Sequence, residues 1–182
     1  MVFLGDSLTD GHGIGVEHTY PSLIQRKVDA LGWPIEVVNA GQSGDTTGMG
    51  LARLAPTMSS EVDVLVVAFG ANDCLHNVNL ERSRENMDQL LASAKQLQPE
   101  IELVLVGVHF PWPFSKRTDV LQSTYSTLAK KHDALWIPSL LKGVTGRREL
   151  NAEDNIHPNR EGHKVMAETV WKKIRPVLLE CR

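Results

Sequence analysis

Short runs of apolar residues alternate with longer amphipathic stretches along the chain. The apolar runs are rich in β-branched residues, which is typical of strands covered on both faces. They predict strands at residues 2–4, 35–38, 62–69, 101–108 and 134–137. Because helical stretches separate these strands, the pattern predicts βα units that build a mostly parallel, five-stranded sheet in an α/β fold.

The amphipathic stretches have the spacing of helices with one apolar face. They predict helices at residues 20–31, 46–54, 80–97 and 119–132. A last helix is expected after Pro158, because proline suits a first helical turn, and Pro176 is expected to loosen its end. No repeat and no long linker divides the sequence, so residues 1–182 are expected to form one domain.

The composition agrees with a compact soluble domain, since 42% of the 182 residues are hydrophobic and 23% are charged. A net charge of -3, with lysines and arginines mostly scattered, argues against a nucleic-acid partner. No apolar run is long enough for stable insertion into a membrane. The first residues lack a secretion-signal pattern, and the sequence leaves open the oligomeric state and whether the protein is cytoplasmic or periplasmic. Cys74 and Cys181 are expected to be free thiols.

Polar segments follow several predicted strands at the point where each strand ends. Ser7 follows the first strand, residues 41–45 follow the second and residues 70–73 follow the third. Residues 154–157 precede the last helix. Because ligands of open α/β sheets bind outside the carboxyl ends of the strands, we expect these segments to converge on one crevice.

Ser7, His157 and Asp154 together offer a nucleophile, a base and an acid. A serine hydroxyl attacks well only when an imidazole accepts its proton and a carboxylate orients that imidazole. Asp154 lies three residues before His157, and Pro158 favours extended backbone at His157. Activity is therefore expected to fall as His157 is protonated, and this chemistry requires no metal and no organic cofactor.

N–H groups near Ser7 are candidates for stabilising a developing oxyanion. Gly41 lies in a glycine-rich segment that lets backbone approach a ligand, and Asn72 offers a carboxamide donor. Each segment also fits an ordinary turn, in which Asp45 or Thr46 caps the next helix and Asn72 is a turn residue. The residues alone leave both interpretations open.

A zinc site is the competing use of the histidines. His157 and His163 are six residues apart, a spacing that does not align them on one helix face. No HExxH or paired-cysteine pattern occurs, so no metal site is expected. The remaining histidines are expected to serve surface or packing roles, among them His12, His18, His76 and His109.

In this order along almost the whole chain, the segments around Ser7, Gly41, Asn72 and His157 resemble the blocks of the SGNH, or GDSL, hydrolase superfamily. The resemblance implies that Ser7 is the nucleophile, with His157 as its base and Asp154 as the partner of that base. It further implies that the Ser7 and Gly41 amides and the Asn72 side chain form the oxyanion hole. The implied fold is a three-layer αβα sandwich of the flavodoxin-like type. No G-x-S-x-G segment occurs, which disfavours an α/β-hydrolase.

Within this superfamily, segments 38–40, 43–46, 50–54 and 70–73 look most similar to a bacterial branch of arylesterases and multifunctional acyl-CoA thioesterases and lysophospholipases. That similarity implies hydrolysis of short to medium acyl or aryl esters, with thioesters and lysophospholipids as further substrates. Two alternatives stay open. One is a carbohydrate O-acetylesterase with the same residues in a more polar cleft. The other is a noncatalytic flavodoxin-like binding module.

An aromatic and proline-rich segment, residues 108–114, follows the fourth predicted strand. We expect Phe110, Trp112 and Phe114 to line an acyl or aryl pocket, because this segment lies at the same edge of the sheet as Ser7. The alternative is a rigid connector whose rings cover the edge of the sheet.

Overall fold

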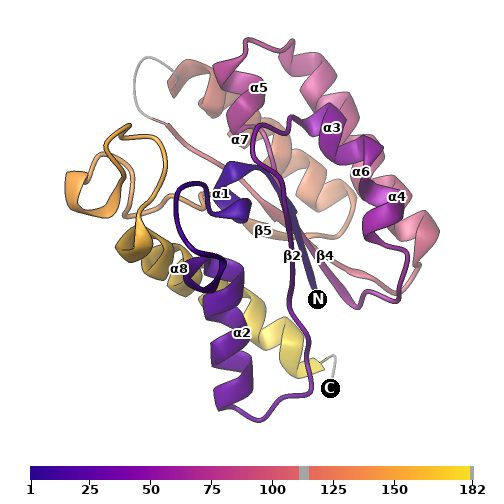
Figure 1. Cartoon of the computed structure of the whole chain (residues 1–182). Coiled ribbons are helices and arrows are strands. Elements are labelled where there is room, and N and C mark those ends of the chain that lie inside the picture. The colour runs from indigo at the N-terminus through magenta and orange to yellow at the C-terminus, as the bar shows by residue number, and fades with distance from the viewer. Residues whose placement is uncertain (111–114, 181–182) are drawn as a thin grey trace.

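A parallel sheet of five strands forms the middle layer of the protein (Figure 1). The computed structural model describes residues 1–110 and 115–180. The strands are β1 (Val2–Gly5), β2 (Val38–Gly41), β3 (Val64–Ala68), β4 (Glu102–Val106) and β5 (Leu135–Ile137). Their order across the sheet is β2-β1-β3-β4-β5, and every neighbouring pair is parallel. The α/β, flavodoxin-like sandwich expected from the sequence is therefore confirmed.

Helices cover both faces of the sheet (Figure 1). The α-helices are α1 (Ser7–Asp10), α2 (Tyr20–Ala30), α3 (Thr47–Ala52), α4 (Leu54–Thr57), α5 (Ala71–Leu75), α6 (Leu80–Leu97), α7 (Ser115–Lys131) and α8 (Arg160–Glu180). Two short 3-10 helices are η1 (Val16–His18) and η2 (Arg148–Leu150). Helices α2 and α8 pack on one face, and α4, α6 and α7 pack on the other. Among the described residues, no helix combines the length and apolar character needed to cross a membrane.

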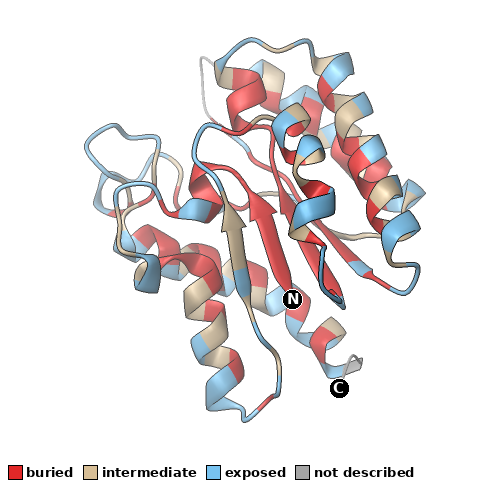
Figure 2. Ribbon diagram, turned by 45° about the vertical axis from the view of Figure 1, so that its right-hand side comes forward, coloured by how far each residue is buried: buried red, intermediate tan, exposed pale blue. Residues whose placement is uncertain are grey.

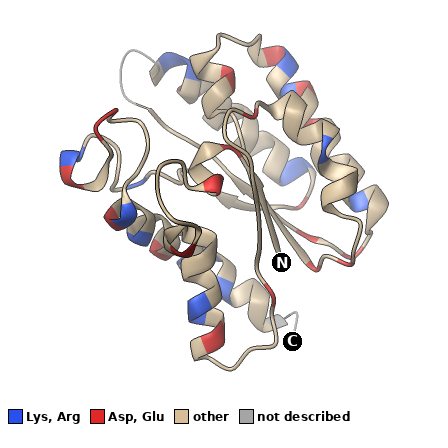
Figure 3. Ribbon diagram, in the orientation of Figure 1, with Lys and Arg blue, Asp and Glu red and all other residues tan. Residues whose placement is uncertain are grey.

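Successive strand residues point to opposite faces and divide the core into two clusters. Phe3 of β1 packs with α2 and α8, whereas its neighbours Val2 and Leu4 pack with α4, α6 and α7. Figure 2 shows the central strands buried and β2, at the margin of the sheet, more exposed. Charged residues of both signs are interspersed on the outer helices (Figure 3).

The second strand begins later than the sequence predicts. Residues 35–38 were expected to be extended in the sheet, but the ladder with β1 starts at Val38. Before β2, the backbone bonds to the Gln25 side chain of α2, which donates to Ile35 O at 3.1 Å and accepts from Val37 N at 2.6 Å. These bonds take the place of bonds to another strand, while the side chains of Ile35 and Val37 pack beside the core.

The predicted helix at residues 46–54 is divided at Arg53 into α3 and α4. Pro56 lacks the N–H that would bond to the Ala52 carbonyl in a continuous helix, which explains the break. The Arg53 side chain instead turns back toward the strands, where it contributes to the site described below.

The other helices agree with the sequence except at their ends. Helix α6 has the predicted bounds, and α7 starts at Ser115 rather than at residue 119. Helix α8 starts after Asn159, whose side chain accepts from the amides of Glu161 and Gly162 at 3.0 and 3.1 Å. Pro158 therefore precedes the helix, and Pro176 lies inside it without ending it.

The strand order creates the crevice in which the polar segments meet. After β1, the next strand β2 is added at one edge of the sheet, whereas β4 and β5 are added after β3 toward the opposite edge. Segments that follow β1 and β3 therefore diverge to opposite faces and leave a crevice between them. Ser7 follows β1, and Asn72 lies in α5 after β3.

Candidate active site

Ser7 begins the short helix α1 directly after β1. The Asp6 side chain caps this helix by accepting a hydrogen bond from the Leu8 amide at 3.0 Å. Gly5 must lack a side chain, because a Cβ there would lie 2.1 Å from Thr9 Oγ1. This tight turn holds Ser7 at the carboxyl edge of the sheet, with 9% of its surface exposed.

His157 reaches Ser7 from the loop before α8. Its Nε2 lies 3.0 Å from Ser7 Oγ, and its Nδ1 lies 2.6 Å from Oδ2 of Asp154. The other carboxylate oxygen of Asp154 accepts from the amides of Ile156 and His157 at 2.9 and 3.0 Å. The fold thus brings Ser7, near the start of the sequence, into one hydrogen-bonded chain with His157 and Asp154, near its end.

The hydrogen bonds to Asp154 fix the position of the protons. Partial burial raises the pKa of Asp154, but bonds from the His157 ring and from the two backbone amides outweigh burial and lower it to about 2. The ionised carboxylate can only accept, so the bridging hydrogen belongs to Nδ1 of His157. In the neutral imidazole, Nε2 then directs its lone pair at the Ser7 hydroxyl, as a general base requires.

The loop that carries His157 is held at both ends. Ala152 N donates to His157 O at 2.8 Å, and Asn151 and Pro158 form an isolated antiparallel bridge. Asn155 has a φ of 56°, a left-handed conformation that asparagine tolerates better than most residues. The loop therefore closes tightly, with Asp154 and His157 on the side facing Ser7.

Gly41 does not offer the free amide expected from the sequence. Its N–H donates to Asn39 Oδ1 at 2.9 Å. The neighbouring Gln42 amide points to β1, where it donates to Gly5 O at 2.9 Å. Because successive N–H groups of a strand alternate in direction, that of Gly41 faces away from β1. Gly41 is needed for packing instead, since a Cβ there would lie 2.1 Å from Asp10 N.

The N–H group of Gly44, unlike that of Gly41, is not bonded within the described residues. Gly44 lies in the turn after β2, closed by a hydrogen bond from Asp45 N to Gln42 O at 3.2 Å. Its φ of 90° favours glycine, and no hydrogen-bond acceptor for its N–H exists among the described residues. The sequence contains both glycines in residues 41–45, but only the directions of their backbone N–H groups in the fold show which of the two is free to donate.

Asn72 lies beside this turn, in the first turn of α5. Its side chain is buried, with 7% of the residue exposed, and Nδ2 donates to Asp45 O at 2.8 Å. A carboxamide nitrogen carries two hydrogens, so one remains for a ligand. The fixed orientation of this donor agrees with the oxyanion role expected for Asn72 rather than with a simple turn.

A buried ion pair anchors the turn that contains Gly44. Arg53 Nε lies 2.5 Å from Asp45 Oδ2, and its terminal nitrogens donate to Ala40 O and Gly5 O at 2.7 and 2.8 Å. The side chain of Asp45 is only 3% exposed. Asp45 therefore serves this ion pair rather than capping the next helix, and Arg53 links two strand ends to the turn.

Two further buried carboxylates lie close to the site. Asp73, next to Asn72, accepts from Thr47 Oγ1 at 2.6 Å and from Ser83 Oγ at 2.7 Å, which ties α5 to α3 and α6. Burial raises the pKa of Asp6 to about 7 against the effect of its bond to the Leu8 amide, and the nearby Asp73 and Asp45 add to the rise.

The sequence profile of the GDSL-like lipase/acylhydrolase family matches residues 3–165, a span that contains every residue of this site. The chain belongs to this family. Among curated relatives, the Pseudomonas aeruginosa protein named esterase TesA is 28% identical over 180 residues, which are 98% of this chain and 89% of that protein. A Vibrio mimicus arylesterase is 29% identical over 96% of this chain and 87% of its own. The Escherichia coli K12 thioesterase 1/protease 1/lysophospholipase L1 is 28% identical over 98% and 84%.

Solved structures of esterases share the fold of this GDSL family member. A crystal structure of TesA superimposes with a TM-score of 0.91 at 26% identity, covering 97% of this chain and 98% of the other. AlinE4, an SGNH-hydrolase family esterase, gives a TM-score of 0.77 at 27% identity over 99% and 94%. The protein is accordingly a carboxylic ester hydrolase of the GDSL family.

The residues expected to line the acyl pocket of this GDSL hydrolase fall in two places. Phe110 is 7% exposed and belongs to the core cluster beneath α2 and α8, so its ring packs against the sheet. This position agrees with the packing alternative for that residue. Trp112 and Phe114 lie outside the described residues.

Two further histidines, His12 and His163, lie near His157 in this GDSL family member. His12, expected at the surface, is exposed but places its ring against His157, with centroids 4.6 Å apart and planes at 41°. His163 is buried and accepts from Tyr20 N at 3.1 Å through Nδ1. Burial, with the nearby His157 adding, lowers the pKa of His163 to about 4.

The remaining sequence expectations concern metals and thiols. Within residues 1–110 and 115–180, no group of three or more His, Cys, Asp and Glu side chains is placed to hold a metal ion. Cys74 is a buried free thiol, as expected, and Cys181 lies outside the described residues.

Proposed function

We propose that Ser7, His157 and Asp154 are the catalytic triad of this esterase. The observation that carries the proposal is the continuous hydrogen-bonded chain from Ser7 Oγ to His157 Nε2, at 3.0 Å, and from His157 Nδ1 to Asp154, at 2.6 Å. Each link has the donor and acceptor that acyl transfer needs.

In the first step, Ser7 Oγ attacks the ester carbonyl while His157 Nε2 takes the hydroxyl proton. The imidazolium that forms is stabilised by the ionised Asp154 and then protonates the leaving alcohol, so the C–O bond breaks and an acyl-serine remains. A water molecule repeats the path: His157 takes its proton as the hydroxide adds to the acyl carbon. The bond from that carbon to Ser7 Oγ then breaks, and His157 returns the proton to Oγ, which releases the carboxylic acid and restores the serine.

The oxyanion of each tetrahedral intermediate needs donors placed beside Ser7. The proposed donors are the backbone N–H groups of Ser7 and Gly44 and the free Nδ2 hydrogen of Asn72. Support comes from the unoccupied Gly44 amide and from the bond of Asn72 to Asp45 O, which aligns the carboxamide with the same turn. Donors fixed before reaction avoid the cost of reorientation as charge develops.

The proposed substrates are short to medium acyl or aryl esters, with thioesters and lysophospholipids as additional candidates. The names of the relatives, esterase, arylesterase and thioesterase/lysophospholipase, support this range. The site also lies open: the side chains of Asp154 and His157 are 43% and 21% exposed, and Ile156 between them is 36% exposed. An apolar exposed residue beside the base suits acyl or aryl groups better than a fully polar ligand.

Replacing Ser7 with alanine tests the proposal. Ser7→Ala should reduce hydrolysis of p-nitrophenyl butyrate by about a thousandfold or more, because the remaining donors bind but cannot form the acyl-enzyme. Ser123→Ala is a matched control, since Ser123 lies exposed on α7, where its hydroxyl donates to Val120 O of the same helix. Near-wild-type turnover by Ser7→Ala would refute the triad.

A fluorophosphonate probe separates an esterase from a binding module. The probe should label wild-type protein and the Ser123→Ala variant but not Ser7→Ala. Failure to label the wild-type protein would favour the noncatalytic alternative. Parallel acyl-chain series on oxygen esters and CoA thioesters would then rank the substrate classes.

A further inference from the structure

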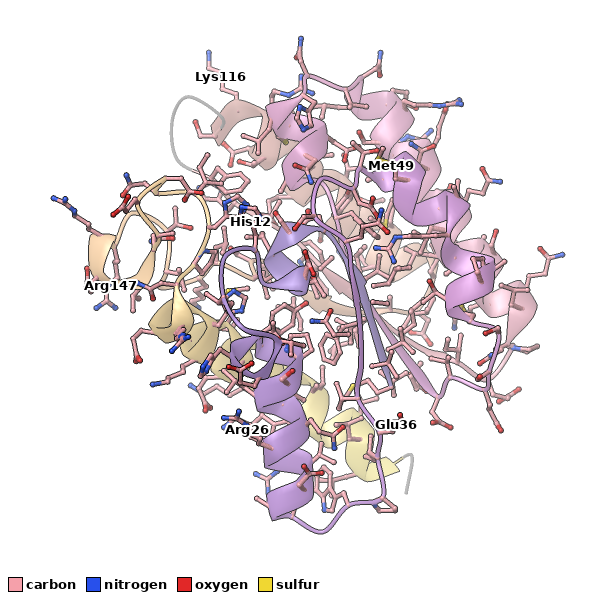
Figure 4. All side chains as sticks on the ribbon, in the orientation of Figure 1. His12, Arg26, Glu36, Met49, Lys116 and Arg147 are labelled. Carbon is pink, nitrogen blue, oxygen red and sulfur yellow. The ribbon has the colours of Figure 1, made fainter. Side chains whose placement is uncertain are left out.

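His12 lies against the imidazole of His157. The ring centroids are 4.6 Å apart and the planes meet at 41°. The His12 amide donates to Ser7 O at 3.2 Å, and Gly11, with a φ of 85°, turns the chain between them. The same tight turn therefore carries the nucleophile and this second histidine. Figure 4 shows His12 between α1 and the loop that precedes α8.

The His12 side chain has no hydrogen bond or ion pair within the described residues, so the ring contact is its one resolved interaction there. The titratable groups on the segments around it are Asp10 of α1, the Glu17–His18 pair of η1, and Asp154 with His157. Asp10 bonds to Ser43 Oγ, and the Asp154 carboxylate bonds to His157, so neither acid is paired with His12.

We propose that His12 is a positioning residue whose ring holds His157 in the orientation that faces Ser7. This inference rests on the proposed role of His157 as base. Asp154 holds Nδ1 of His157 throughout, but the bond from the Ser7 hydroxyl to Nε2 is lost once Ser7 carries the acyl group. A second ring packed against His157 restricts its motion at that stage.

Two substitutions of His12 test the role of its ring. His12→Ala removes the ring and should lower kcat about tenfold with little change in KM, because orientation of the base matters in the reacting complex. His12→Phe keeps a ring and should restore kcat.

The assay is hydrolysis of p-nitrophenyl butyrate from pH 5 to pH 9, with melting temperatures to verify folding. His18→Phe is the matched control, because His18 belongs to the neighbouring η1, pairs with Glu17 at 3.1 Å and should leave both readouts unchanged. A kcat of His12→Phe as low as that of His12→Ala would overturn the role of the ring. A change in KM alone in His12→Ala would also overturn the inference, because it would indicate direct substrate contact.

The fluorophosphonate experiment distinguishes failure of the His12 inference from failure of the proposed function. If the probe labels Ser7 while the His12 variants behave as wild type, only the His12 inference fails. If Ser7→Ala retains activity, the proposed function itself fails.

Discussion

Replacing Arg53 with methionine should destabilise the protein far more than removing an exposed ion pair. The guanidinium joins the buried Asp45 carboxylate to the carbonyls of Ala40 and Gly5. Methionine fills much of the same volume but leaves a carboxylate, 3% exposed, without its cation. The variant thus isolates one buried charge while preserving most of the packing.

The expected loss is about 3–5 kcal/mol in the free energy of unfolding, the usual cost of removing one partner from a buried pair. The carbonyl losses add little, since Gly5 O retains the Gln42 amide at 2.9 Å. For a protein of this size, each kcal/mol lowers the melting temperature by roughly 2–4 °C. Arg53→Met should therefore melt roughly 6–20 °C below wild type.

Urea unfolding of Arg53→Met, Asp45→Asn and the double variant tests the cause as well as the size. If the stranded charge dominates, the double variant is more stable than Arg53→Met, because asparagine is far less costly to bury than a carboxylate. Arg84→Met, which removes the exposed pair with Glu81, should stay close to wild type. A loss below about 1 kcal/mol in Arg53→Met would refute the reasoning.

Other predictions concern pH and the oxyanion donors. The pKa of His163, about 4, lies below that of an unfolded histidine, so stability should fall as pH drops from about 6.5 to about 4. His163→Gln, which keeps an acceptor for Tyr20 N, should flatten this fall in urea unfolding; an unchanged slope would contradict it. The contribution of Asp6 to stability should depend on pH in the opposite direction. Because its pKa is raised to about 7, stability should fall as pH rises from about 4 to about 7. Asp6→Asn should remove that loss in the same urea unfolding experiment. Gly44→Ala strains a backbone with a φ of 90° and should lower kcat more than KM in ester hydrolysis, whereas an unaltered kcat would argue against Gly44 as a donor.

Residues of the site differ in how far the sequence determines them. Ser7, Asp154 and His157 could be identified because their chemistry demands those side chains, and the order of strands brings them together. The sequence prediction names Gly41 as a donor and does not distinguish it from Gly44, because both are glycines in one segment. Only the alternation of N–H directions at the end of β2 distinguishes them, and that depends on the register with β1.

Contacts between side chains distant in sequence account for the other differences. The apolar run before β2 looked like strand, and nothing local indicated that a glutamine of α2 would bond to its backbone. The Arg53 ion pair and the contact of His12 with His157 likewise exist only in the folded chain. In contrast, the bounds of α6 were predictable because its periodicity and its capping Asn79 are both local.

The glutamine beside β2 also determines what the margin of the sheet presents to other molecules. Met1 N donates to Glu36 O at 2.9 Å, so the backbone groups of residue 36 face β1. Ile35 O and Val37 N alternate with them and therefore face outward, where Gln25 bonds to both. The outward N–H of Gly41 is bonded to the side chain of Asn39 in the same way.

Edge strands with free outward N–H and C=O groups are templates on which a strand of another chain can add, and this is a common route to aggregation. Here two side-chain amides occupy several of the positions that such a strand would use. At Ile35, Val37 and Gly41, these side chains disfavour intermolecular β-pairing without an additional strand.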